Sequence, residues 1–264
     1  MNLIDSLDEF NHNGIVKIEN FINPKEILQL KNKLVNLGLP KKGEEKSIIY
    51  YEKMRLFDQL KNFFTIKLYK KFASLKKIKV FANTALQHKT NLYYIDTYFS
   101  EQSTNPVLDW HFDQAYSGRE NVNKNELLNP NSAAIKFFIY LSDTYSDNGC
   151  LSYIKGSNKV AYILKKLIYE GQIDYKPYWT LEQFENIITK EENLLKLKKY
   201  INENLIINFL NKVKKIKQVK KNFYDYDISC NQGDMIIFDE SGCHRGSKLL
   251  FTDRYVLRFL FKRI

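Results

Sequence analysis

The feature that most constrains this chain is a series of short segments rich in aromatic and β-branched residues, with no helix recurring regularly between them. Segments of this kind, bounded by Asn, Asp, Gly or Pro, predict β-strands. The expected strands are residues 14–21, 78–87, 91–100, 107–113, 133–143, 150–154, 234–240 and 254–261. A doubly wound α/β fold needs helices that alternate with parallel strands, so this order of elements argues against it.

Helices are expected before the strands and in one long stretch among them. Asn23 and Pro24 provide a capped start and Gly38 a stop for one helix. Residues 5–10 and 54–76 predict further helices, and the second has Leu56, Leu60, Phe63 and Phe64 at helical spacing. Residues 159–220 return to a helical pattern, with one apolar face marked by Leu194, Leu197, Ile201, Leu205 and Phe209. We therefore expect one domain over residues 1–264, mainly β with flanking helices (α+β): a jelly roll with helices at its N-terminal end and a helical insertion at 160–225.

Composition bounds the class of protein. A chain of 264 residues is long enough to bury a core, and 44% hydrophobic and 14% aromatic residues are typical of a globular protein. The formal net charge of +11 permits a nucleic acid, a membrane surface or an anionic substrate as partner. The sharpest basic cluster, residues 211–222, is interpreted first as the solvated face of a helix and second as a binding patch.

Cysteine usage and the N-terminus indicate the compartment. Cys150, Cys230 and Cys243 are odd in number and form no Cys-x-x-Cys pair, so a disulfide framework is not expected. The opening MNLIDSLDEFNHNG has two early acids and no apolar run, unlike a signal peptide. No stretch approaches the roughly 18–20 apolar residues that a membrane span needs. We expect a cytoplasmic protein without a membrane span; nothing in the sequence predicts its oligomeric state.

The stretch LDWHFDQAY, residues 108–116, places His111 and Asp113 one residue apart on a predicted strand. Successive side chains of a strand point to opposite faces, so this pair points one way and Phe112 the other. An imidazole nitrogen and a carboxylate oxygen can then meet one metal ion. The alternative for these two residues by themselves is a buried hydrogen-bonded pair.

A third ligand is sought among the remaining histidines. His12 and His88 lie in a helix–turn region and after a strand, where a surface role is expected. His244 instead follows a strong apolar strand, in the stretch GDMIIFDESGCHRGS. Arg254 opens the next strand, RYVLRFLF, from which its guanidinium can hold a carboxylate through two hydrogen bonds.

Two histidines and one carboxylate on one face of an ion form the facial triad of non-heme Fe(II) oxygenases. The open coordination positions admit a bidentate oxo-acid and O₂. A zinc site would more often use three histidines, two histidines with a glutamate, or cysteines. The donor set therefore favours Fe(II) over zinc.

The sequence resembles the phytanoyl-CoA dioxygenase family, a branch of the Fe(II)- and 2-oxoglutarate-dependent oxygenases. The resemblance is carried by HFD at 111–113, DNGCLSYIKGSNK at 147–159 and NQGDMIIFDESGCHRGS at 231–247, and it extends to residues 9–38 and about 91–159 and 231–262. It implies a double-stranded β-helix core of the jelly-roll or cupin-like type. Asn158 stands where the family usually has a histidine that supports a turn.

The resemblance also implies roles for residues. His111, Asp113 and His244 would bind Fe(II), and Arg254 would hold the far carboxylate of the cosubstrate 2-oxoglutarate, with O₂ as second cosubstrate. Arg258 is the rival for the carboxylate, and Ser247 would assist Arg254. Halogenating relatives replace the carboxylate ligand with a small residue, so the presence of Asp113 favours hydroxylation or another oxidation over halogenation.

Substrate identity is less constrained. We expect hydroxylation of an unactivated C–H bond of a small metabolite, anionic or carrier-linked, with release of succinate and CO₂. Candidate pocket residues are Trp110, Tyr116, Arg119 and Arg245, which lie near the ligands in sequence. The insertion at 160–225 is a candidate lid or substrate wall. Two alternatives stay open: an oxygenase acting on a macromolecule such as nucleic acid, which is not the favoured partner, and a non-catalytic barrel that only binds a ligand.

Overall fold

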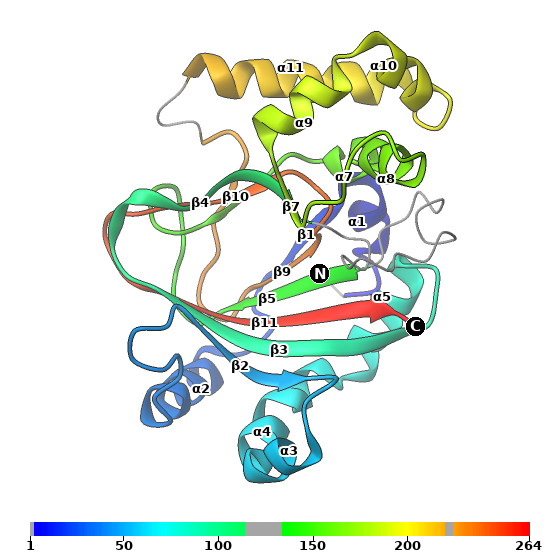
Figure 1. Cartoon of the computed structure of the whole chain (residues 1–264). Helices are drawn as coiled ribbons and strands as arrows, with labels where there is room; N and C mark the ends of the chain where they lie inside the picture. The colour runs from blue at the N-terminus through cyan, green and yellow to red at the C-terminus, as the bar shows by residue number, and fades with distance from the viewer. Residues whose placement is uncertain (1–2, 114–133, 220–223) are drawn as a thin grey trace.

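The computed structural model describes residues 3–113, 134–219 and 224–264, and the strands of these residues form two antiparallel sheets (Figure 1). The large sheet has the order β1 (Ile15–Ile18), β9 (Met235–Asp239), β5 (Ala134–Tyr140), β11 (Arg254–Arg263), β3 (Thr90–Ser100) and β2 (Lys46–Tyr51). The small sheet has the order β7 (Tyr178–Thr180), β4 (Ser103–Asp113), β10 (His244–Leu249), β6 (Leu151–Tyr153) and β8 (Asp227–Ile228). Most neighbouring strands are distant in sequence, as in a jelly roll. The predicted α+β fold with a two-sheet core is confirmed.

Helices cover the outer faces of both sheets. One group of helices lies near the N-terminus, before or just after the first strands: α1 (Leu7–Asn13), α2 (Pro24–Asn36), α3 (Leu56–Lys61), α4 (Phe63–Ala73) and α5 (Lys76–Ala85). A second group belongs to the middle of the chain: α7 (Ser157–Val160), α8 (Tyr162–Tyr169), α9 (Leu181–Ile188), α10 (Glu191–Lys198) and α11 (Glu203–Val219). Figure 1 shows α2, α3 and α4 at the opposite end of the molecule from α9, α10 and α11. None of the helices in the described part of the chain is both long and apolar enough to cross a membrane.

Strand alternation divides the core into layers. On β5, Ile135, Phe137 and Ile139 point to the outer face, where they join the cluster covered by α1, α2, α4 and α5. Phe138 and Tyr140 point inward and pack in a second cluster between the sheets. Since side chains alternate along a strand, the polar residues that share the inner face are brought between the two sheets.

The middle helices pack on the outer face of the small sheet. Trp110 and Phe112 of β4 are buried there with apolar residues of α8, α9 and α11. The Phe112 ring lies 4.2 Å from that of Phe184 and 6.2 Å from that of Phe209, measured between centroids. Phe112 therefore fastens the helical segment to the strand that carries His111 and Asp113.

We predict that Phe112→Ala lowers the free energy of unfolding by about 3–5 kcal/mol, because truncation of a fully buried phenylalanine loses apolar contact and leaves a cavity. Phe112 is 1% exposed. Phe251→Ala is the control, since that ring is 57% exposed and should change stability by no more than about 0.5 kcal/mol. Chemical denaturation of both variants measures the difference, and equal stabilities would contradict the role given to Phe112.

One predicted strand is wrong: residues 78–87 form most of α5 instead. Ile, Val and Phe in this stretch suggested a strand. Ile78, Phe81 and Ala82 are nevertheless buried at the spacing of one helix face and pack against the large sheet. Tertiary burial thus outweighs the strand preference of these residue types.

The helix predicted over 54–76 is interrupted at Asn62, which separates α3 from α4. The buried face of α4 consists of Ile66, Tyr69, Phe72 and Ala73, whereas the apolar residues singled out in the sequence are exposed. The prediction of an all-helical stretch at 159–220 is also wrong at β7, which pairs with β4. β2, β8 and β10 were not predicted as strands.

Candidate active site

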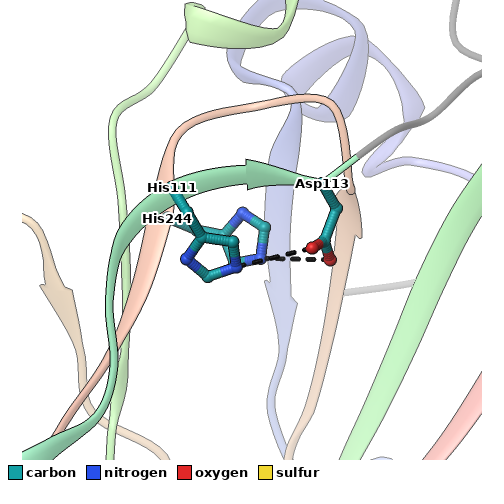
Figure 2. A group of neighbouring side chains, drawn as sticks. All are labelled: His111, Asp113 and His244. Atoms are coloured by element: carbon teal, nitrogen blue, oxygen red, sulfur yellow. Dashed lines mark ion pairs between the residues drawn. The ribbon is translucent and has the colours of Figure 1, made fainter. Parts of the chain in front are cut away.

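Two strands of the small sheet bring His111, Asp113 and His244 together (Figure 2). His111 and His244 are directly opposite each other on β4 and β10, and Asp113 lies two residues along β4 on the same face. Nε2 of His111 is 3.5 Å from Oδ1 of Asp113, and Nε2 of His244 is 3.6 Å from Oδ2. One possible ligand atom from each residue lies within 4.8 Å of the others. The spacing suits three ligands around one ion.

Backbone carbonyls orient both imidazoles. Nδ1 of His111 lies 2.6 Å from the carbonyl oxygen of Asp109, and Nδ1 of His244 lies 2.8 Å from that of Gly242. A carbonyl only accepts, so each Nδ1 carries a proton and each Nε2 is the ring nitrogen that faces Asp113. Burial, followed by the nearby His111, lowers the pKa of His244 to about 4, which keeps this imidazole neutral at pH 7 and leaves its Nε2 free to bind a metal. Two imidazole nitrogens and a carboxylate fit Fe(II).

A tight turn before β10 places the Gly242 carbonyl. The side chain of Asp239 accepts hydrogen bonds from the backbone N–H of Ser241 at 2.9 Å and from its hydroxyl at 2.6 Å. Asn158 donates to the same carboxylate at 3.0 Å, so it supports this turn where the family usually has a histidine. A Cβ on Gly242 would lie 1.9 Å from the hydroxyl oxygen of Tyr153. Glycine is therefore required where the chain turns toward His244.

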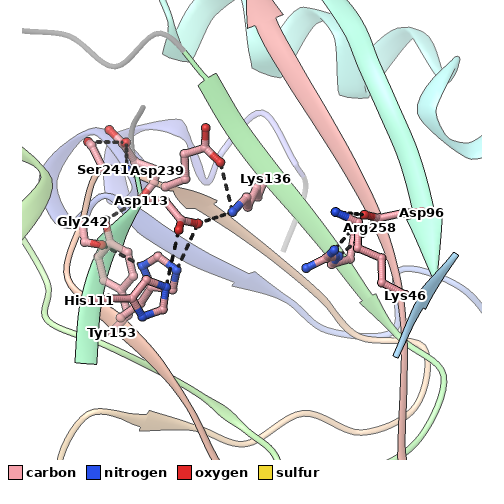
Figure 3. A network of polar contacts seen from close by, with 12 residues as sticks. Lys46, Asp96, His111, Asp113, Lys136, Tyr153, Asp239, Ser241, Gly242 and Arg258 are labelled. Atoms are coloured by element: carbon pink, nitrogen blue, oxygen red, sulfur yellow. Dashed lines mark hydrogen bonds and ion pairs between the residues drawn. The ribbon is translucent and has the colours of Figure 1, made fainter. Parts of the chain in front are cut away.

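Lys136 lies beside Asp113 (Figure 3), and Glu240 lies next to Lys136. Nζ of Lys136, on β5 of the large sheet, contacts Oδ2 of Asp113 and lies 3.0 Å from Oε2 of Glu240. Burial by itself would raise the pKa of Asp113, but the positive charge of Lys136 outweighs it and holds that pKa well below its usual range. Asp113 is therefore ionised, as a metal ligand must be.

Arg254 is a buried cation without a carboxylate partner among the described residues. Its side chain is 6% exposed. Nη1 donates to the carbonyl of Gly149 at 2.8 Å and Nη2 to the hydroxyl of Ser100 at 3.2 Å, while Nε has no hydrogen-bond partner within the described part of the chain. Burial lowers its pKa from the ordinary value. An uncompensated buried guanidinium is costly, which points to an anionic ligand.

Arg258, on the same strand face, already has its partner. Nε and Nη2 each donate to Asp96 at 2.7 Å in a bidentate pair (Figure 3). Asp96 is fully buried and also lies 3.4 Å from Nζ of Lys46. The contacts thus separate the two arginines: Arg258 is neutralised by Asp96, whereas no described carboxylate neutralises Arg254.

Ser247 is buried on β10, and its hydroxyl lies 3.4 Å from Sγ of Cys150. Its backbone N–H donates to the carbonyl of Cys150 at 2.9 Å, next to Gly149. A Cβ on Gly149, whose φ is +73°, would lie 3.0 Å from Cδ of Arg254. Ser247 and Gly149 thus belong to the wall beside Arg254, although the described hydrogen bonds of the guanidinium go to Gly149 and Ser100 and not to Ser247.

The structure does not bring the described substrate candidates to the triad. Trp110 lies on the outer face of β4 in the cluster with the middle helices. Arg245 also points outward: its guanidinium stacks 5.0 Å from the Trp110 ring, and Nη2 lies 3.3 Å from Oδ1 of Asp227. Strand alternation explains both, because each residue is adjacent to a candidate ligand. Tyr116 and Arg119 lie outside the described residues.

Three residues near the triad were missed in the sequence. The sequence offered a hint for Lys136, since it is the one charged residue in the apolar stretch AAIKFFIY, and for Glu240, which follows a strongly apolar strand. It offered no hint for Tyr178, because this residue lies in the stretch expected to be helical. On β7 it is opposite Asp113, and its ring stacks 5.0 Å from that of His111 at 27°. The middle segment therefore reaches the triad through Tyr178.

Known proteins share this architecture. HygX from Streptomyces hygroscopicus with iron bound is 14% identical, with a TM-score of 0.56, over 98% of this chain and 86% of HygX. The epimerase SnoN in complex with Fe³⁺, alpha ketoglutarate and nogalamycin RO is 10% identical, with a TM-score of 0.60, over 99% of this chain and 83% of SnoN. EctD from S. alaskensis in its apoform is 12% identical, with a TM-score of 0.56, over 98% of this chain and 76% of EctD. At these identities the likeness shows the fold.

The sequence itself identifies the family. Among curated proteins, no sequence matches the chain. The sequence pattern of the phytanoyl-CoA dioxygenase (PhyH) family, however, matches residues 10–248, which is most of the chain and includes all three residues of the triad. The chain belongs to the phytanoyl-CoA dioxygenase family of iron- and 2-oxoglutarate-dependent oxygenases.

Proposed function

We propose that this protein hydroxylates an unactivated C–H bond of a small metabolite, using Fe(II), 2-oxoglutarate and O₂, with release of succinate and CO₂. The observation that carries the proposal is the combination of the triad with the buried Arg254, which has no carboxylate partner among the described residues. A metal site alone fits many activities. A metal site that shares the space between two sheets with an uncompensated guanidinium fits a metal-chelating dicarboxylate.

In this proposal, His111, Asp113 and His244 hold the iron, and Arg254 holds the far carboxylate of 2-oxoglutarate. Iron and 2-oxoglutarate, when bound, supply the oxidising chemistry. The carbonyls of Asp109 and Gly242 orient the two imidazoles so that both Nε2 atoms face the metal position, and Lys136 keeps Asp113 ionised. Lys136 contacts Oδ2 of Asp113, which favours Oδ1 for the metal. Ser247, which lies in the wall beside Arg254, is proposed to assist Arg254 in holding the far carboxylate of 2-oxoglutarate.

The middle segment, 160–225, is proposed as a substrate wall. Its anchoring by Phe112 and the stacking of Tyr178 on His111 support a fixed wall beside the triad. Tyr178 has a raised pKa, because it is partly buried and lies near Asp109 and Asp113, so its hydroxyl stays protonated at neutral pH. A neutral aromatic donor at this position suits a substrate with polar oxygen groups.

A small-molecule substrate is favoured over nucleic acid by the pairing of charges on α11. In the basic stretch predicted from the sequence, Lys215 lies 2.5 Å from Asp225 and Lys217 lies 2.7 Å from Glu185. HygX with hygromycin B bound and SnoN with nogalamycin RO are structural relatives that hold small molecules. Nucleic acid stays the alternative, and a steep loss of binding with added salt would support it. The three free cysteines support the proposed cytoplasmic location.

The experiment that tests the proposal uses the whole protein with Fe(II) and 2-oxoglutarate. Without air, the mixture is expected to show a weak visible charge-transfer band; in air, it is expected to release succinate slowly even without substrate. Absence of both contradicts the proposed activity.

A succinate-release screen over candidate metabolites then identifies the substrate. Structural relatives include an epimerase and the carbocyclase SnoK, so product mass decides the reaction. Hydroxylation adds one oxygen atom, epimerisation leaves the mass unchanged, and ring closure removes two hydrogens. A product without added oxygen would contradict the proposed hydroxylation but not the proposed use of Fe(II) and 2-oxoglutarate.

A further inference from the structure

An apolar, basic surface lies at the end of the molecule formed by α3 and α4. Leu56, Phe57, Leu60 and Phe64 are 73%, 75%, 65% and 84% exposed, and Phe63 is 49% exposed. We call these five residues, with the basic side chains between residues 53 and 71, the α3–α4 surface. Soluble monomers rarely expose large apolar side chains in such a continuous group.

The apolar side chains of α3 are not needed to hold this helix against the rest of the protein. Among its six residues, Leu56–Lys61, none is buried. α4, in contrast, buries one face against the large sheet through Ile66, Tyr69 and Phe72. The apolar residues of α3 therefore contribute little to the core, so their exposure needs another explanation.

The same surface is strongly basic. Residues 53–71 contain six basic side chains, Lys53, Arg55, Lys61, Lys67, Lys70 and Lys71, and the single acid Asp58. Of these cations, Lys71 alone forms an ion pair within the described residues, at 2.8 Å from Glu26. This differs from α11, where Lys215 and Lys217 are paired. The other five cations of the α3–α4 surface thus have no acidic partner in the described part of the chain; Lys70 is half-buried over the Tyr50 ring, at 4.3 Å from its centroid, and the rest are exposed.

The apolar and basic groups are interleaved. A groove of about 430 Å³ has Leu56, Leu60 and Phe63 along it, with Lys67, Lys70 and Lys71. A second groove joins Phe64 and Lys67 of α4 to Leu37, just after α2. The surface therefore extends from α3 across α4 to α2, with lysines throughout.

We propose that the α3–α4 surface docks on an anionic phospholipid bilayer. Projecting Phe and Leu side chains insert into the headgroup boundary, and the surrounding lysines meet the lipid phosphates. The polar amides on α3 and at its end are held against their own backbone: Gln59 donates to the carbonyl of Met54 at 2.8 Å, and Asn62 to that of Asp58 at 3.0 Å. Exposed apolar groups among cations that mostly have no acidic partner within the described residues suit a fluid anionic surface.

Self-association through the same surface is opposed by its charge. A two-fold interface places identical patches face to face, which would bring basic side chains against basic side chains. Docking on a bilayer also leaves the triad accessible, because α3 and α4 lie on the far side of the large sheet from β4 and β10 (Figure 1). The protein would then work while attached to the membrane surface.

Vesicle sedimentation tests the inference with the full chain. The probes are vesicles of phosphatidylcholine alone and vesicles in which about a third of the lipid is phosphatidylglycerol. We expect the protein to sediment with the anionic vesicles at low salt and to stay in solution with the neutral ones. Phe57→Ser/Phe64→Ser should weaken this partitioning by about tenfold or more, because two aromatic side chains no longer insert.

The matched control is Leu195→Ser/Phe251→Ser, which removes two apolar side chains that are 54% and 57% exposed elsewhere on the molecule. The control should sediment like the wild type, and circular dichroism should show all three proteins folded. Absence of sedimentation with either vesicle overturns the inference. So does equal binding to neutral vesicles, or equal binding of the Phe57/Phe64 variant. A dimer in sedimentation velocity that this variant abolishes would assign the surface to a second copy instead.

Discussion

His111→Ala is expected to weaken Fe(II) binding by at least about a hundredfold and to abolish the charge-transfer band with 2-oxoglutarate. The variant removes one of three proposed ligands, whereas loss of an outer hydrogen-bond partner alone costs about 10–100-fold in metal affinity. It also leaves His244 and Asp113 without the third donor that would hold the ion between β4 and β10. Anaerobic calorimetric titration with Fe(II) measures the change.

His88→Ala is the matched control, because His88 is an exposed histidine outside the triad. It should bind Fe(II) as the wild type does. Thermal unfolding without metal should show that His111→Ala is still folded, which separates lost binding from lost structure. Wild-type Fe(II) affinity in His111→Ala would rule out this residue as a ligand, and the proposed metal centre with it.

Arg254→Ala should raise the dissociation constant of 2-oxoglutarate by about thirtyfold or more, since removing one partner of a buried charge pair costs about 2–5 kcal/mol. Fe(II) affinity should change little, because Arg254 contacts Gly149 and Ser100 and none of the triad. Protein stability without ligand should hardly fall, since the variant removes a buried cation that has no carboxylate partner in the described residues. Titration of the Fe(II)-loaded protein with 2-oxoglutarate measures the affinity.

Arg258→Ala is expected to affect protein stability more than 2-oxoglutarate affinity, the reverse of Arg254→Ala. It should lower the free energy of unfolding by up to about 3–5 kcal/mol, because Asp96 is fully buried and loses its bidentate partner. The remaining ion pair of Asp96 with Lys46 moderates the loss. 2-Oxoglutarate affinity should change less than in Arg254→Ala. If Arg258→Ala weakens 2-oxoglutarate more, the two roles must be exchanged.

Much of the site could be predicted because strand geometry is local. His111 and Asp113 share a face since they are two residues apart on one strand, and the same alternation sends Phe112 into the outer cluster. It also explains why the side chains of Trp110 and Arg245 point away from the triad: each is directly next to one of its residues in the chain. Adjacent residues of a strand point to opposite faces, so nearness in sequence alone does not bring a side chain to the triad.

Predictions that depended on burial were less successful. The stretch 78–87 has the residue types of a strand but lies in α5, because its Ile78, Phe81 and Ala82 pack as one helix face. Leu56, Leu60, Phe63 and Phe64 have helical spacing but lie at the surface. Spacing predicts which residues share a face, whereas the neighbouring sheet decides whether that face is covered.

The sequence by itself determined the two-sheet class of fold, the family and the three residues of the triad, because residue type, strand period and short motifs are local properties. The tertiary structure decided what surrounds them. It brought Lys136 and Tyr178 from other strands to the triad, paired Arg258 with Asp96, and left Arg254 without a carboxylate among the described residues. These are contacts between residues distant in the chain, and their energies depend on burial and on the partner, neither of which a single sequence specifies.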